Sequence, residues 1–180
     1  MIEKKITLVP IGDIDDSLLE YISQSIKTTF NLNTHLIPCQ DLIGCVPEPV
    51  FGGRYNSTTL LKQFHECLPG KIFKLVAITD LDLYSPIFSC FFGEAQLGGC
   101  CALISLHRLG QEYYGLVEDK ALFLSRCEKE VIHEISHLFG LLHCSDNNCI
   151  MYPSNNIIDT DVKSSSFCPS CNSLIERALV

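Results

Sequence analysis

Positively charged residues are scarce in this chain. Of its 180 residues, 13 are lysine or arginine and 21 are aspartate or glutamate, so its formal net charge is −8. An acidic protein is repelled by the phosphates of nucleic acids and by anionic membrane surfaces. The composition therefore argues against nucleic acid and against a membrane surface as partners.

Long uninterrupted hydrophobic runs are also missing. The most apolar stretch, residues 86–106, is broken by Glu94, Gln96 and three glycines, which makes it a poor membrane-spanning helix. The short apolar run at residues 6–11 fits a strand better than the core of a secretion signal. A hydrophobic content of 47% is enough for one well-buried core. We therefore expect a single domain over residues 1–180, monomeric and cytoplasmic.

One stretch of eleven residues carries most of the chemistry. It reads HEISHLFGLLH, from His133 to His143, and matches the pattern HExxHxxGxxH. His133 and His137 are four residues apart, so on a helix they share one face and can reach one zinc ion. Gly140 can adopt a positive φ, which would end the helix and turn His143 back as a third ligand. Three protein ligands leave a fourth position for water, as in catalytic zinc sites.

Glu134 stands beside these ligands and is better placed to accept a proton from a zinc-activated water than to bind the ion. A bare HExxH also arises by chance on ordinary helices, where the histidines pack in the core. The added Gly140 and His143 argue against that alternative, because five fixed positions must match together. We predict a catalytic zinc site with Glu134 as general base.

Four cysteines follow directly. Cys144 and Cys149 form a C-x4-C pair, and Cys168 and Cys171 form a C-x2-C pair after 18 further residues. These spacings are typical of a closed tetrahedral zinc site with four thiolate ligands. Two alternatives stay open: disulfide bonds among the four, or redox activity of the second pair. The redox alternative would require a thioredoxin-like setting after a βαβ unit, whereas this pair lies in a short tail.

The remaining cysteines and histidines lie outside these motifs. We expect the cysteines to be reduced, small buried residues, and the sequence indicates no role for the adjacent pair Cys100 and Cys101. His35, His65 and His107 have no partners at ligand spacing and are expected to be ordinary histidines. The cysteines in question are Cys39, Cys45, Cys67, Cys90, Cys100, Cys101 and Cys127.

A methionine follows the second cysteine, in Cys149-Ile150-Met151-Tyr152-Pro153, and suggests a tight turn under the metal site. The segment 133–171 resembles the archaemetzincin signature, an extended HExxHxxGxxHC motif continued by C-x4-C, a methionine and C-x2-C. Residues 79–84, 92–95 and 104–109 resemble the same family with less specificity. The likeness covers most of the chain from about residue 70 and, more loosely, its N-terminal third.

Archaemetzincins are metzincin metallopeptidases, so the resemblance implies a peptidase with a peptide or protein substrate. It also implies a Met-turn at Met151 beneath the catalytic zinc, and an edge strand that pairs with extended peptide. We expect two zinc ions per chain, one catalytic and one structural. The alternative function is a zinc-bearing peptide-binding module with little hydrolysis, but such a module has no need for a base at Glu134. Aminopeptidase and endopeptidase activity both fit.

The hydrophobic pattern predicts an α/β fold, compact and metzincin-like. Strands alternate with helices early in the chain, which favours a twisted, mostly parallel sheet packed against the active-site helix. We expect that helix to begin near Ser125, because residues 125–128 have the S-x-x-E form of a capping box. Residues 39–56, which hold five glycines and prolines, are expected to form a loop. Strands are expected at residues 5–11, 34–37, 72–79, 88–93 (the antiparallel edge) and 101–106, and helices at 15–30 and 57–68.

Overall fold

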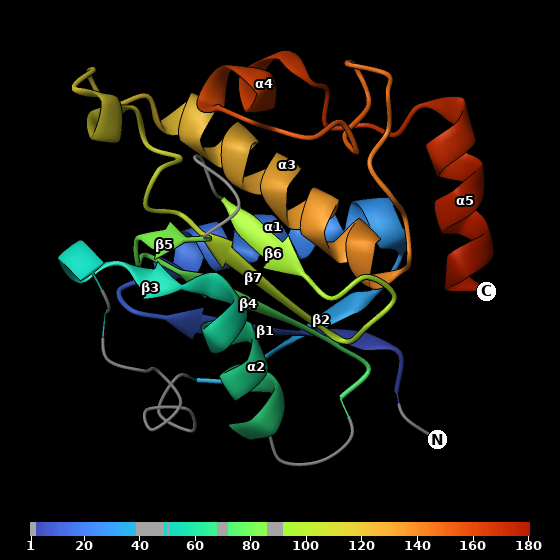
Figure 1. Ribbon diagram of the computed structural model, residues 1–180. Coiled ribbons are helices and arrows are strands. Elements are labelled where there is room, and N and C mark those ends of the chain that lie inside the picture. Colours follow the sequence, from blue (N-terminus) through green and yellow to red (C-terminus); the bar gives the residue numbers. More distant parts are fainter. Residues whose placement is uncertain (1–2, 39–48, 50, 68–71, 86–91) are drawn as a thin grey trace.

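A five-stranded sheet forms the centre of the protein (Figure 1). The computed structural model describes residues 3–38, 49, 51–67, 72–85 and 92–180. The strand order is β2-β1-β4-β7-β6, and only the last pair is antiparallel. The expected mostly parallel sheet with an antiparallel edge strand is therefore confirmed. Its strands are β1 (Lys5–Ile11), β2 (Asn33–Leu36), β4 (Lys74–Thr79), β6 (Gly93–Ala95) and β7 (Cys101–Ser105).

Helices cover both faces of this sheet. Helices α1 (Asp16–Phe30) and α3 (Lys120–Leu138) pack on one face, and α2 (Ser57–Cys67) packs on the other. The central strands are apolar on both sides, as is usual when a parallel sheet is buried between helices. In β1, for example, Ile6 and Leu8 join the core under α1, whereas Val9 joins the core under α2.

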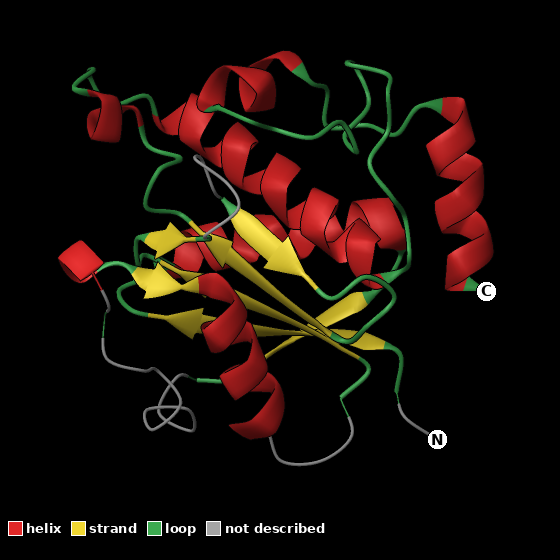
Figure 2. Ribbon diagram, in the orientation of Figure 1, coloured by secondary structure: helices red, strands yellow, loops and turns green. Residues whose placement is uncertain are grey.

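The segment after α3 consists mainly of turns and loops (Figure 2). It contains two further helices, α4 (Ile157–Val162) and α5 (Pro169–Leu179). Most of the loop expected at 39–56 lies outside the described residues. The other short elements are the 3-10 helices η2 (Phe51–Gly53) and η3 (Gln111–Tyr114) and the parallel pair β3 (Tyr55–Asn56) and β5 (Leu83–Tyr84).

The predicted start of the active-site helix is wrong. Helix α3 begins at Lys120, and the Asp119 carboxylate caps it by accepting a hydrogen bond from the Leu122 amide at 2.9 Å. Ser125 lies inside the helix, so its capping-box match is accidental. The predicted end is close to the observed one: α3 stops at Leu138, and Gly140 has a φ of +89°. The edge strand expected at 88–93 overlaps β6 only at Gly93: β6 continues to Ala95, Phe92 lies in a bend, and residues 88–91 lie outside the described part.

Within the described residues, the helices are all too short or too polar to span a membrane.

The cysteines outside the predicted metal cluster differ from one another. Cys67 takes part in a disulfide bond and is exposed, so the expectation of a reduced, buried cysteine is wrong there. Cys100, Cys101 and Cys127 are free thiols, as expected. Cys39, Cys45 and Cys90 lie outside the described residues.

Candidate metal centres

Helix α3 presents His133 and His137 on one face, with both rings held by main-chain carbonyl groups. Nδ1 of His133 lies 2.8 Å from the Ile150 carbonyl oxygen, and Nδ1 of His137 lies 2.7 Å from that of Leu141. A carbonyl oxygen can only accept, so each Nδ1 carries the proton and each Nε2 keeps a lone pair. The two Nε2 atoms are 3.1 Å apart, close to the separation of about 3.3 Å expected for two nitrogen ligands of one tetrahedral zinc.

His143 completes the cluster from the chain after the helix. Its ring centroid lies 5.3 Å from that of His133 and 4.9 Å from that of His137. One nitrogen from each of the three rings lies within 4.8 Å of the others. Burial is the largest influence on all three rings and lowers their pKa values, most strongly that of His133. Neutral imidazoles are the form that binds metal, so the three could hold one ion.

Glu134 lies next to this cluster and is almost completely buried, with 6% of its surface exposed. Burial raises the pKa of its carboxyl group, and the charges of Glu130 and Glu94 raise it further. A dication bound at the histidines would act in the opposite direction. Gly93 on β6 makes room for the side chain, because a Cβ there would lie only 2.9 Å from Glu134 Cγ. The edge strand and the carboxylate are therefore packed tightly together.

These groups face a cavity of about 410 Å³. One wall is helix α3 with His133, His137 and Glu134, and His143 from the chain after the helix lies beside it. Another wall is the edge strand with Glu94, together with Leu97 just after it. The segment 153–155, which begins two residues after Met151, lines the cavity as well. The site predicted from sequence thus lies between the active-site helix and the edge of the sheet.

Sequence reasoning missed a buried ion pair beside the cluster. Lys163 Nζ lies 3.1 Å from Glu130 Oε1, and both side chains are at least 96% buried. Glu130 also accepts a hydrogen bond from Thr160 Oγ1 at 3.2 Å, and Lys163 donates to the Tyr152 carbonyl at 3.5 Å. The pair therefore links α3 to the turn after Met151. Glu130 could have been suspected, because it precedes Glu134 by one helical turn, but no pattern marks Lys163.

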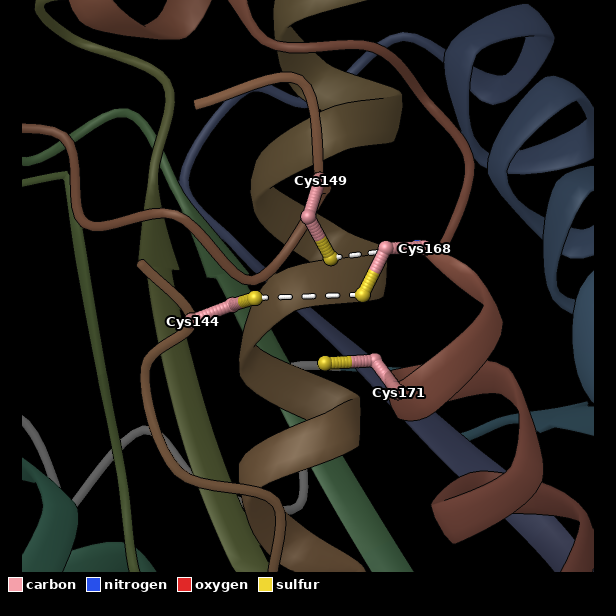
Figure 3. Close-up of side chains that lie close together, drawn as sticks. All are labelled: Cys144, Cys149, Cys168 and Cys171. Carbon is pink, nitrogen blue, oxygen red and sulfur yellow. Dashed lines mark hydrogen bonds between the residues drawn. The ribbon is translucent and has the colours of Figure 1, made fainter. Parts of the chain in front are cut away.

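The four predicted cysteines also come together, with their sulfur atoms pointing toward one another (Figure 3). The Sγ atoms of Cys144 and Cys168 are 3.8 Å apart, which equals the edge of about 3.8 Å in a tetrahedron of zinc–sulfur bonds. Cys149 Sγ accepts a hydrogen bond from the Cys168 amide at 3.3 Å. None of the four is in a disulfide bond. Hydrogen bonds, chiefly from the Cys171 amide, lower the pKa of Cys168 to about 7, whereas burial raises the pKa values of Cys149 and Cys171. Metal binding would displace the protons of these two thiols.

The two clusters share one piece of main chain. The Cys144 amide donates to the Met151 carbonyl at 2.9 Å, and the Tyr152 amide donates to the Cys149 carbonyl at the same distance. Met151 is fully buried in this tight turn. The Ile150 carbonyl, one residue earlier, is the acceptor that orients His133. The turn predicted around Met151 therefore connects the cysteine cluster to a histidine ligand.

Comparison with known proteins identifies the family. A family described as Peptidase family M54 matches residues 58–177. The archaemetzincin of Methanocaldococcus jannaschii is 36% identical over 172 residues, which cover 93% of this chain and 90% of the relative. That of Pyrococcus furiosus is 35% identical over 185 residues, covering 97% and 93%.

Solved structures agree. The crystal structure of archaemetzincin from Methanopyrus kandleri superimposes with a TM-score of 0.80 at 29% identity, covering 97% of this chain and 94% of the other. That from Archaeoglobus fulgidus, complexed with malonate, gives 0.76 at 32% identity, covering 94% and 99%. Family, fold and motif thus agree, and this chain belongs to peptidase family M54, the archaemetzincins, and is a zinc metallopeptidase.

Proposed function

We propose that peptide hydrolysis takes place at the three-histidine cluster, with His133, His137 and His143 as zinc ligands and Glu134 as general base. The observation that carries this proposal is the orientation of the helical histidines. Both use Nδ1 to donate to a main-chain carbonyl, so that their Nε2 atoms converge, 3.1 Å apart, on the cavity. A buried carboxylate lies beside them on the same helix. This is the donor set that catalytic zinc sites use.

A zinc ion held by these three histidines would act as a Lewis acid, polarising the scissile carbonyl and lowering the pKa of a water molecule to about 7. Glu134 takes the proton from the attacking water and delivers it to the leaving amine. The carboxyl group must therefore hold a proton between the two transfers. Burial and the nearby charges of Glu130 and Glu94, which raise its pKa, suit it to that role.

The substrate binds along the edge strand. In the described part of the sheet, β6 pairs with β7 on one side and has no strand on its other side. Its residues Gly93, Glu94 and Ala95 line the cavity together with the histidines. An extended peptide can add to such an edge by main-chain hydrogen bonds. This would bring its carbonyl groups past the metal cluster.

The cysteine cluster takes a structural zinc. Cys144, Cys149, Cys168 and Cys171 supply four sulfur ligands, which leave no position for water or substrate. The proposed role is to hold the turn at Met151 and the chain at His143 in place. The hydrogen bond from Cys144 to Met151 supports it, because it ties the neighbour of one histidine ligand to the turn that orients another.

The test is cleavage of a diverse synthetic peptide library by the zinc-loaded protein, read by mass spectrometry. The fragments show whether the enzyme works from a terminus or internally. Glu134→Gln should lower turnover about 10²–10⁴-fold, since general acid–base catalysis contributes that much, while zinc content and melting temperature stay unchanged. Glu118→Gln, which alters an exposed carboxylate outside the cavity, is the matched control. Full activity of Glu134→Gln would refute the assignment of the base.

A further inference from the structure

A third group of metal-binding side chains lies on the opposite face of the sheet from α3. It consists of His65 near the end of α2 and the adjacent Cys100 and Cys101, the second of which begins β7. Nδ1 of His65 lies 3.4 Å from Cys100 Sγ and 3.6 Å from Cys101 Sγ, and the two sulfur atoms are 3.7 Å apart. The three donor atoms therefore form a compact triangle, although 35 residues separate the histidine from the cysteines.

The triangle has the dimensions of a zinc site. Zinc–sulfur bonds of about 2.3 Å and zinc–nitrogen bonds of about 2.0–2.1 Å at tetrahedral angles place two sulfurs about 3.8 Å apart. The same bonds place sulfur and nitrogen about 3.6 Å apart. All three observed separations lie within about 0.2 Å of these values. Two thiols and an imidazole suit zinc and similar thiophilic ions, whereas magnesium and calcium prefer oxygen ligands.

The surroundings also suit an ion. Cys101 is buried, Cys100 is partly buried and His65 is exposed, so an ion can reach the group from solvent. Burial raises the pKa of the Cys101 thiol to about 12, so a zinc ion would have to displace the thiol proton when it binds. Cys100 and Cys101 are free thiols, so neither is withdrawn from binding by a disulfide.

We propose that His65, Cys100 and Cys101 bind a further zinc ion, which fastens α2 to the hairpin between β6 and β7. Solvent completes its coordination. The ion is separate from those assigned to the histidine and cysteine clusters above. It joins two elements that contact each other across the face of the sheet opposite α3.

The hairpin is connected to the catalytic cavity, which gives this site a consequence. Its Gly98 amide donates to the His137 carbonyl at 2.9 Å. At the other end of α2, Ser57 and Thr58 donate to the Glu94 carboxylate at 2.6 Å and 3.0 Å. Helix α2 thus contacts the edge strand near the start of the helix, and the proposed zinc would fasten the hairpin near its end. The ion would hold the hairpin that borders the cavity without contacting substrate.

Native mass spectrometry of the zinc-loaded full chain tests the stoichiometry. The wild type should carry three zinc ions, and His65→Ala and Cys100→Ser should each carry two. The double variant should also carry two, because both changes remove one site. His35→Ala, which alters an exposed histidine on β2, is the matched control and should keep three. Because His65 is exposed, its replacement leaves the core intact even if Cys100→Ser folds poorly.

An equal number of zinc ions in the wild type and in His65→Ala would overturn the proposal. So would a wild type in which Cys100 and Cys101 form a disulfide, seen as a mass lower by two hydrogens with no third ion. His133→Ala separates this test from the proposed function, because it removes an ion from the histidine cluster and should leave the third site occupied. Hydrogen exchange gives a second readout: amides of residues 96–101 should exchange faster in His65→Ala than in the control, and unchanged exchange would refute the fastening role.

Discussion

The histidine and cysteine clusters follow one another within residues 133–171 but are built differently. Two of the three histidines lie on one helix, and each of these depends on a carbonyl group outside that helix for its orientation. The four cysteines come from two separate segments and would be joined directly to one another by the metal. The histidine cluster is therefore oriented by the main chain around it, whereas the cysteine cluster, with its proposed ion, would hold the main chain around it in place.

The two clusters also differ in their access to solvent. The histidines form part of the wall of a cavity, and His143 is exposed. Cys149 and Cys171 are buried, and the cysteine cluster does not line that cavity. Three ligands beside a cavity leave room for a reaction, whereas four ligands in a closed site leave none. On the proposed assignment, zinc would serve catalysis at one cluster and structure at the other within a short segment.

Removing the cysteine cluster should have the largest effect. A structural zinc of this kind contributes roughly 10–16 kcal/mol to folding, so the double variant Cys168→Ser, Cys171→Ser should unfold the turn that orients His133. We expect it to lose zinc from both clusters, measured as zinc per chain together with the melting temperature. Cys127→Ala, at a buried free cysteine outside the cluster, should keep both ions. An occupied histidine cluster in the double variant would show that the two sites are independent.

Breaking the buried ion pair should have the next largest effect. Lys163→Met leaves the Glu130 carboxylate buried without its partner, and such changes cost about 3–5 kcal/mol. We expect that loss in the free energy of unfolding, measured by urea denaturation. The double variant Glu130→Gln, Lys163→Met should be more stable than Lys163→Met alone, because the unpaired charge is gone. A Lys163→Met variant as stable as the wild type would show that the pair does not support the turn.

Filling the space at Gly93 should disturb the site at the histidine cluster and leave the cysteine cluster unchanged. The added Cβ of Gly93→Ala would lie 2.9 Å from Glu134 Cγ and 3.0 Å from the Leu103 carbonyl oxygen. Overpacking of this kind costs about 1–3 kcal/mol and displaces the proposed base. Steady-state kinetics should show a lower kcat, with zinc content unchanged at both clusters. Wild-type turnover would mean that Glu134 tolerates the shift.

Removing the cap of α3 should have the smallest effect. The Asp119 carboxylate caps the helix, so Asp119→Ala should cost about 1 kcal/mol. Thermal melting should detect this loss, whereas Ser125→Ala should change stability little because Ser125 lies inside the helix. A larger loss of stability in Ser125→Ala than in Asp119→Ala would instead support a helix that begins at Ser125, as the capping-box pattern predicts.

Much of the fold could be predicted from local pattern. The apolar run of β1 and the helical spacing of Leu18, Ile22 and Ile26 in α1 identify these elements to within a residue, because both bury a continuous face. The histidine and cysteine clusters could be found because metal coordination requires particular residues at particular spacings, and the structure brings each set together. The start of α3 was wrongly predicted at Ser125 because a four-residue capping pattern is short enough to occur by chance.

Contacts between distant residues could not be predicted in this way. Glu130 and Lys163 are 33 residues apart and meet only because the chain after α3 returns over the helix. His65 and Cys100 meet because α2 packs on the start of β7, so a histidine without partners in sequence gains two in space. Such pairs depend on tertiary packing, which no local spacing records.

The acceptor for His133 lies at Ile150, later in the chain than every histidine of the cluster. Cys168 and Cys171 come later still. Since a ribosome makes the chain from its amino end, the helix with both histidines emerges before the residues that orient it. If the cysteine cluster holds the turn as proposed, the peptidase site would assemble only after residue 171 has left the ribosome. A nascent chain stalled before that residue should bind peptide substrate poorly while its sheet is already complete.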